Sequence, residues 1–430
     1  MFRFIITVLL CSYPLATYAA QLEPSGNPAR NVQQSVSAES NSSPASLSLD
    51  QRRRAAKKLW FDGQVVQAAK QYKEILDVSE KSGQRDSHLA ADLYANGSLA
   101  IETGQLAEAM AYFQRALDLV RDKPLSDAEI RSSIGSLFAL QGLFSQAEVY
   151  LKSSIQSFSK HAGPNDLRTA RAWNVLGWVY TASGDFNQAT EAVQKAEHIT
   201  DRILAPDSIE RIPFLDHHAE LLSQIGRYSE AEKLWLEAAR IDQNSRGEND
   251  PQFDVILLHL GHMYSTIGEY QSAQESLEHF LSIEENVLPQ GSLAQAVALA
   301  ELGNAYTHLK DHSEAEPTLE KSMDMLRTLP STVPLANALV CNYLGDYLMS
   351  RQRWSEAAEQ YRQALETRES LIPHTALVAG TMSSLSRALE KLKQKREAKR
   401  YKKQAEAILA EQHNPVYAGE TVDLKSFRAR

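Results

Sequence analysis

The sequence predicts an all-α fold, an α–α superhelix of stacked helix–turn–helix repeats, from three observations. A short phrase recurs along the chain, and its nine alanines are separated by steps of 41, 38, five times 42, and 41 residues. Within each copy, apolar residues lie three and four apart, which is the spacing of one helix face. No copy alternates apolar with polar residues, so the blades of a β-propeller are excluded. The alanines are Ala68, Ala109, Ala147, Ala189, Ala231, Ala273, Ala315, Ala357 and Ala398.

The first twenty residues are interpreted as a secretory signal peptide. A charged start at Arg3 precedes the apolar run Phe4–Leu10, and small residues follow at Ala16–Ala20. This order is typical of an export signal, with cleavage after Ala19 or Ala20. The run is far shorter than the roughly 20 residues that span a bilayer, and no later stretch approaches that length. We therefore expect an exported protein, periplasmic or secreted, whose mature chain has no transmembrane segment.

Residues 21–48 are predicted to be a disordered tether. They contain 8 Ser, 3 Pro and 3 Asn and almost no large apolar side chain, so they cannot bury enough surface to offset chain entropy. The solenoid is predicted over residues 49–410, and residues 411–430 are assigned to a C-terminal tail.

Each repeat is predicted to contain two helices joined by a tight turn. In the fourth repeat, Trp173, Leu176, Gly177 and Tyr180 mark the first helix, and the second follows the turn with Ala189 on its buried face. Because Gly177 has no side chain, it is expected to let the two helices approach closely, with Ala189 facing the glycine. The sixth repeat has the equivalent pair Gly261 and Ala273.

Three further positions carry local expectations. Asp250 and Pro251 resemble the cap and first residue of a helix. Pro317 lies early in a second helix, where it removes one backbone hydrogen bond, so a local distortion rather than a break is expected. Lys402 stands where the last repeat should have a bulky apolar residue, as in a terminal repeat with a solvated outer face.

The recurring helix pair, with its small residues at positions such as Gly177 and Ala189, resembles tetratricopeptide repeats. The 42-residue unit is similar to the longer variety found in kinesin light chains. The resemblance implies a right-handed solenoid of about nine repeats, in which the first helix of each repeat lines a concave groove. It also implies that the fifth and ninth positions of that helix point into the groove. They form a polar, acidic row with one aromatic that is expected to be partly exposed, suited to a peptide backbone and basic side chains. The candidate groove residues are Asn174, Trp178, Asp216, Glu220, His262, Asn304, Asn342 and Asp346.

Composition and motifs argue against catalysis and against nucleic-acid binding. The formal net charge is −9, which disfavours nucleic acid as a partner. Two cysteines exclude a disulfide framework or a cysteine-ligated zinc site. No phosphate-binding glycine loop, GxSxG or HExxH motif occurs, so no enzyme activity and no cofactor are expected.

Histidine leaves one alternative open. His259 and His262 are neighbours on one helix surface, and His217 occupies the place of His259 one repeat earlier. With Glu220 nearby, a surface zinc site is geometrically allowed. No other ligand is fixed by spacing, so groove and packing roles are the preferred interpretation, and no metal site is predicted.

A basic patch is predicted near the end of the solenoid. Residues 387–403 hold nine basic and two acidic side chains, and they could dock on anionic lipid, an acidic partner or a second copy of the chain. A solvated capping helix is the simpler interpretation. The candidate patch consists of Lys395, Arg396, Lys399, Arg400, Lys402 and Lys403.

The predicted function is that of an exported, non-catalytic interaction scaffold that holds a peptide or protein in its groove. The alternative is an oligomerising assembly or sensor factor of an envelope complex, which would use its terminal repeats and basic C-terminal helix. A homo-oligomer is compatible with either function.

Overall fold

The computed structural model describes residues 48–61, 64–83, 85–246, 253–287, 291–329, 334–373 and 375–412. These residues form eighteen α-helices and one 3₁₀ helix, with no strand among them. The first nine α-helices are α3 (Leu49–Phe61), α4 (Val65–Lys81), α5 (Ser87–Glu102), α6 (Leu106–Leu119), α7 (Pro124–Leu140), α8 (Phe144–His161), α9 (Leu167–Ser183), α10 (Phe186–Ile203) and α11 (Ile212–Gln224). They are followed by α12 (Tyr228–Arg246), α13 (Phe253–Ile267), α14 (Tyr270–Val287), α15 (Leu293–Leu309), α16 (His312–Thr328), α17 (Pro334–Ser350), α18 (Trp354–Leu371), α19 (Ala376–Lys391) and α20 (Lys395–Gln412). The 3₁₀ helix η2 (Ile209–Arg211) precedes α11.

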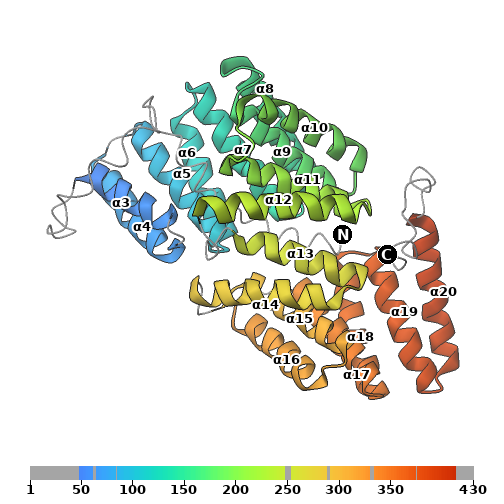
Figure 1. Ribbon diagram of the computed structural model, residues 1–430. Helices are drawn as coiled ribbons and strands as arrows, with labels where there is room; N and C mark the ends of the chain where they lie inside the picture. The colour runs from blue at the N-terminus through green and yellow to red at the C-terminus, as the bar shows by residue number, and fades with distance from the viewer. Residues whose placement is uncertain are drawn as a thin grey trace. The chain divides into compact units, whose positions relative to one another are not determined.

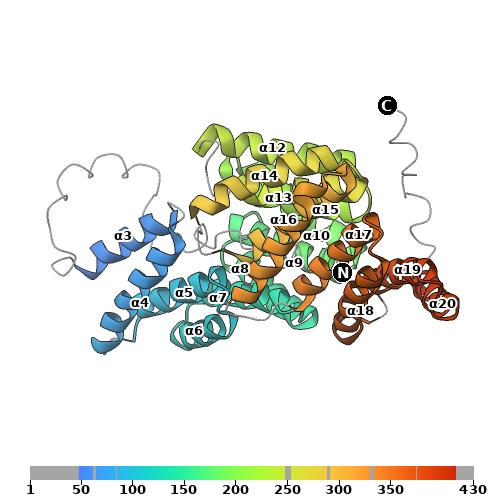
Figure 2. The ribbon, with the colours of Figure 1, turned by 90° about the horizontal axis from the view of Figure 1, so that it is seen from below.

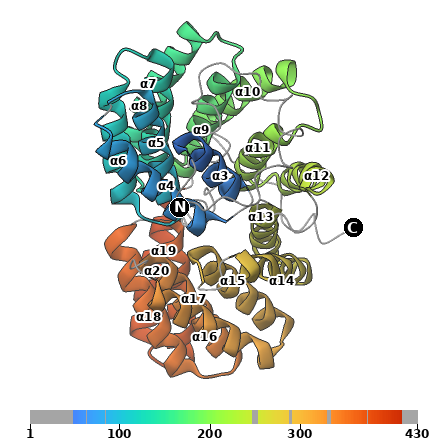
Figure 3. The same cartoon turned by 90° about the vertical axis from the view of Figure 1, so that its left-hand side faces the viewer.

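The helices pair into nine successive hairpins, from α3–α4 to α19–α20, which confirms the predicted all-α repeat architecture (Figure 1). The two helices of a hairpin lie side by side, as α19 and α20 do in Figure 2 and α7 and α8 do in Figure 3. The predicted signal peptide lies outside the described residues, as do the tether before Ser48 and the tail after Gln412. The expected helix start at Asp250 and Pro251 also lies outside them.

The chain forms two compact units. The N-terminal unit comprises the described residues up to Leu176 together with Lys195–Ile203, and the C-terminal unit comprises Gly177–Gln194 and the described residues from Leu204 onward. In the C-terminal unit, one continuous apolar cluster runs from Leu257 in α13 to Ile408 in α20. Stacking of neighbouring hairpins therefore creates the core of this unit, as expected for repeats that cannot bury their own apolar faces.

Glycine in the first helix of a repeat lies against a bulky side chain of the second helix, which corrects one expectation. A Cβ added at Gly261 would lie 2.6 Å from Cγ of Leu277, and one at Gly177 would lie 3.1 Å from Cγ2 of Val193. The predicted facing residues, Ala273 and Ala189, lie one helical turn earlier. Six glycines share this relation with the residue sixteen positions later. The pairs are Gly97–Phe113, Gly135–Leu151, Gly177–Val193, Gly261–Leu277, Gly303–Leu319 and Gly345–Tyr361.

The turns inside the hairpins from α5–α6 to α19–α20 each contain a residue with a left-handed backbone, and two kinds of residue occupy this position. Gly104, Gly142, Gly184, Gly226 and Gly268 adopt φ between 75° and 84°, which glycine tolerates at no steric cost. The last three turns have other residues in this conformation. These are Lys310 at φ 65°, Gln352 at φ 60° and Lys393 at φ 63°.

The end of the array behaves as a cap. Pro317 lies within α16 without ending it, as predicted. On α20, Ala398, Ala405 and Ile408 are buried, whereas Lys402 is exposed, which confirms the solvated outer face expected of a terminal repeat. Across the described part of the chain, no helix combines the length and the apolar character that a bilayer crossing requires.

Candidate binding surface

The predicted groove residues lie on the first helices of their hairpins, and five of the eight are buried. Asn174 and Trp178 lie on α9, Asp216 and Glu220 on α11, and Asn304 on α15. The other three, His262 on α13 and Asn342 and Asp346 on α17, are half-buried. Asn174 belongs to the N-terminal unit and the rest to the C-terminal unit.

Trp178 was predicted to be partly exposed, and this is wrong, because it is only 3% exposed. Its ring stacks on the imidazole of His217, with centroids 6.3 Å apart and planes inclined by 25°. The aromatic side chain thus fills the space between α9 and α11 instead of presenting a free face.

Asp216 joins two successive repeats through hydrogen bonds. Its Oδ1 accepts from Nε1 of Trp235 at 2.7 Å and lies 2.7 Å from Nδ1 of His259. Burial by itself would raise the pKa of Asp216, but the His259 charge and hydrogen bond outweigh it and lower the pKa. Burial likewise opposes protonation of His259, yet Asp216 raises the pKa of this imidazole. The two groups therefore form a buried ion pair.

His259 and His262 do not form the surface pair that their spacing suggested. His259 is buried against Asp216, and His262 lies 3.2 Å through Nδ1 from Oε1 of Glu301. The imidazole of His217 stacks on the ring of Trp178. Among the described residues, no three or more His, Cys, Asp and Glu side chains are grouped so that they could hold a metal ion.

Like Asp216, Glu301 is a hub, by which we mean a polar residue that interacts with side chains of neighbouring repeats. The sequence did not single it out. This fully buried carboxylate on α15 interacts with His262 of the preceding repeat and accepts a 2.9 Å hydrogen bond from the Tyr343 hydroxyl of the following one. Burial and the Glu301 charge raise the pKa of Tyr343 well above its usual value. The available signal was a single carboxylate in the α15 stretch Ala296–Tyr306, whose other side chains, apart from Asn304, are apolar or aromatic.

A third hub centres on Asp346 and Asn342 of α17. Asp346 accepts a 2.7 Å hydrogen bond from the Tyr361 hydroxyl and a 3.2 Å bond from the Asn342 amide. Burial raises the pKa of Asp346. Arg368, which was also not singled out, donates to Oδ1 of Asn342 at 3.2 Å and to the Thr381 hydroxyl. Burial lowers the pKa of Arg368 to about 10.

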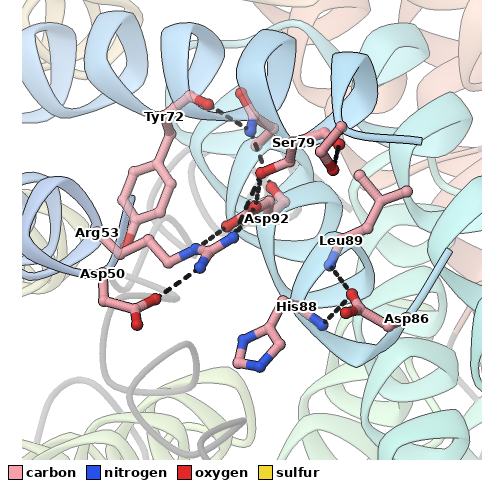
Figure 4. Close-up of polar contacts among 10 residues, drawn as sticks. Asp50, Arg53, Tyr72, Ser79, Asp86, His88, Leu89 and Asp92 are labelled. Carbon is pink, nitrogen blue, oxygen red and sulfur yellow. Dashed lines mark hydrogen bonds and ion pairs between the residues drawn. The ribbon is translucent and has the colours of Figure 1, made fainter. Parts of the chain in front are cut away.

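The N-terminal unit has the same kind of link (Figure 4). Arg53 on α3 donates two hydrogen bonds, of 2.8 and 2.7 Å, to the buried carboxylate of Asp92 on α5, and Ser79 donates a third at 2.6 Å. Asp86 caps the start of α5 by accepting from the amides of His88 and Leu89. Polar residues of the first helices therefore bind one repeat to the next in both units.

The basic patch is fully displayed to solvent. All six predicted side chains are exposed on α20, whose residues Ala398 and Ala405 are buried. Arg400 lies 3.8 Å from Glu397, an exposed contact that contributes little to stability. The patch is thus available to an anionic partner, and it is also what a solvated capping helix would present.

Comparison with known proteins gives one family. Models described as tetratricopeptide repeat match residues 93–122, 126–200, 213–286, 256–328 and 338–373. The comparison with curated proteins found no match.

Solved structures with the same fold include the quorum sensor NprR, alone and with its cognate peptide, and a Rap protein in a complex. The apo quorum sensor NprR from B. thuringiensis is 15% identical, with a TM-score of 0.58 over 84% of this chain and 98% of that chain. NprR in complex with its cognate peptide NprX is 16% identical, with a TM-score of 0.53 over 85% and 100%. A Rap protein complexed with Competence and Sporulation Factor is 13% identical, with a TM-score of 0.58 over 84% and 98%. At these identities the likeness establishes the fold alone.

Proposed function

Because the chain belongs to the tetratricopeptide repeat family, we propose that it is a non-catalytic scaffold that binds a peptide or protein partner. One observation carries the proposal: the hairpin array resembles NprR and Rap structures over more than four fifths of this chain, and structures of both hold a partner. A fold shared at low identity does not fix function, so we assign the binding surface from residues of this chain.

We assign the partner to the first helices of the repeats in the C-terminal unit. His262, Asn342 and Asp346 keep part of their surface open there, and the hubs at Glu301 and Asp346 hold them in place. Side chains that are already fixed lose little conformational entropy when a ligand binds. An amide suits a peptide backbone and a carboxylate suits a basic side chain, so the row would bind by shape and fixed polar groups without a covalent step.

Site-specific photocrosslinking tests this surface. A photoreactive amino acid is placed at His262 or Asp346, and as a control at Leu236, which is 51% exposed on the second helix α12. The chain is irradiated in the compartment where it resides, and the captured products are identified. The proposal expects the same peptide or protein to be captured from positions 262 and 346 but not from 236. Equal capture from all three positions, or from none, would contradict it.

We also propose that the protein is exported, on the strength of Arg3, the apolar run Phe4–Leu10 and the small residues Ala16–Ala20. Mass spectrometry of the protein from its native host should find an N-terminus at Ala20 or Gln21. A chain that starts at Met1 and stays with the cytoplasmic fraction would refute export while leaving the binding proposal intact.

A further inference from the structure

A pocket lies among α16, α17 and α18 of the C-terminal unit. Its volume is about 930 Å³, within the range of ~300–1,000 Å³ typical of ligand sites. The second helices α16 and α18 form its walls, and the first helix α17 forms its floor. The groove residues Asn342 and Asp346 are not among its lining.

The floor of the pocket is mostly apolar. Leu344 and Leu348 of α17 line it together with Met323 of α16, and Met323 packs against the buried Cys341. Such a floor favours an apolar side chain of a ligand, because covering it removes apolar surface from water.

The walls carry an uneven charge. Both guanidinium groups of the pocket are already paired, since Arg353 contacts Glu316 and Glu356 at 2.7 Å, and Arg327 contacts Asp324 at 2.7 Å. These three acids are therefore compensated within the pocket.

Two carboxylates are left over, Glu320 on α16 and Glu359 on α18. Within the part of the chain that the structure describes, Glu320 has no polar partner, and Glu359 accepts only a 3.3 Å bond from the amide of Gln363. Both are exposed, and both line the pocket, one from α16 and the other from α18. A cation placed between the walls would meet two negative charges with no competing cation of the pocket free to bind them.

We propose that this pocket binds a peptide segment of a partner protein in which a lysine or arginine stands next to a bulky apolar residue. The cationic group lies between Glu320 and Glu359, and the apolar side chain covers Met323, Leu344 and Leu348. The pocket adds a second surface to the proposed scaffold, and it rests on that proposal only for the ligand being a peptide.

Peptide selection on the full chain tests the inference. A phage library of random heptapeptides is selected on the wild type and on the double variant Glu320→Gln/Glu359→Gln. Selected sequences are then made as synthetic peptides, and their affinities are measured by calorimetry. Glu366→Gln is the matched control, because Glu366 is exposed on α18 but does not line the pocket.

The wild type and the control should enrich Lys or Arg beside an apolar residue, and the double variant should bind these peptides about tenfold more weakly. The loss should shrink in 0.5 M salt because the contacts are exposed. Peptides that bind the double variant equally well would overturn the pocket while leaving the scaffold intact. If no peptide binds any form of the chain, the pocket proposal fails, whereas the scaffold proposal is decided by the crosslinking experiment. Spermidine binding at the affinity of the peptides would instead assign the pocket to a free polyamine and overturn the peptide claim.

Discussion

The close contact between Gly303 and Leu319 predicts the outcome of a substitution that would ordinarily stabilise a helix. Gly303→Ala should gain about 0.5–1 kcal/mol of helix propensity. The new Cβ would lie 2.6 Å from Cγ and 2.8 Å from Cδ2 of Leu319, and 3.3 Å from the carbonyl oxygen of Ala315. Overpacking of this kind costs about 1–3 kcal/mol. We therefore expect a net loss of roughly 1–2 kcal/mol in the free energy of unfolding.

In a Leu319→Ala background, the effect of Gly303→Ala on the free energy of unfolding should have the opposite sign. Leu319→Ala alone leaves a cavity and costs about 2–5 kcal/mol. In that background both contacts with Leu319 are removed and the 3.3 Å approach to the Ala315 carbonyl oxygen remains, so Gly303→Ala should stabilise the protein by up to about 0.5–1 kcal/mol. Gly380→Ala in α19 is the control for propensity alone, because a Cβ there has no neighbour within 4 Å.

Urea unfolding followed by circular dichroism gives the overall change. Hydrogen exchange over α15 and α16 locates it, because repeat arrays need not unfold as a single unit. If Gly303→Ala stabilises the wild type as much as Gly380→Ala does, the contact does not limit how closely the helices approach, and our account of the glycine position is wrong.

Three further predictions concern charge. The Asp216–His259 pair has a lowered carboxyl pKa and a raised imidazole pKa, so its stabilisation should be greatest between about pH 4 and 6.5, fading below as Asp216 protonates and above as His259 deprotonates. Melting temperatures should therefore show His259→Gln to be more harmful at pH 5.5 than at pH 9, and an equal loss at both would contradict the ion pair. Burial raises the pKa of Glu129 to about 7 against the opposing charges of two nearby arginines, so stability should fall as the pH rises from about 4.5 to 7; Glu129→Gln should flatten that slope, and an unchanged slope would refute it. Reversing four charges of the basic patch should abolish retention on anionic vesicles at low salt, with light scattering checking whether the oligomeric state changes as well; unchanged retention would leave the patch as a solvated cap. The reversed positions are Lys399, Arg400, Lys402 and Lys403.

The periodicity of the sequence was enough to predict the architecture. The nine alanines gave the number of hairpins, and the spacing around Gly177 and Ala189 gave two helices in each. The same pattern did not predict which residue of the second helix contacts Gly177. Ala189 and Val193 lie one helical turn apart on the same buried face, so either could have been the partner. Only the structure shows that the partner of Gly177 is Val193.

Exposure along the groove row was harder to predict than position. Every candidate falls on the expected helix, yet burial depends on how closely successive first helices approach, and that distance is set by the packing between repeats. Glu301 and Arg368 escaped notice because their partners lie on other repeats, such as Tyr343 and Asn342. The pocket among α16, α17 and α18 is hidden in the sequence for the same reason, since its lining comes from three helices.

The left-handed turns have a mechanical consequence. A side chain in this backbone conformation costs about 1–2 kcal/mol, and among the turns that the structure describes this cost falls on the last three hairpins, at Lys310, Gln352 and Lys393. Under a force applied to the two ends of the chain, we expect these hairpins to peel away before the glycine-hinged ones. The order in which the hairpins unfold under force would thus be set by the backbone conformation of three turn residues.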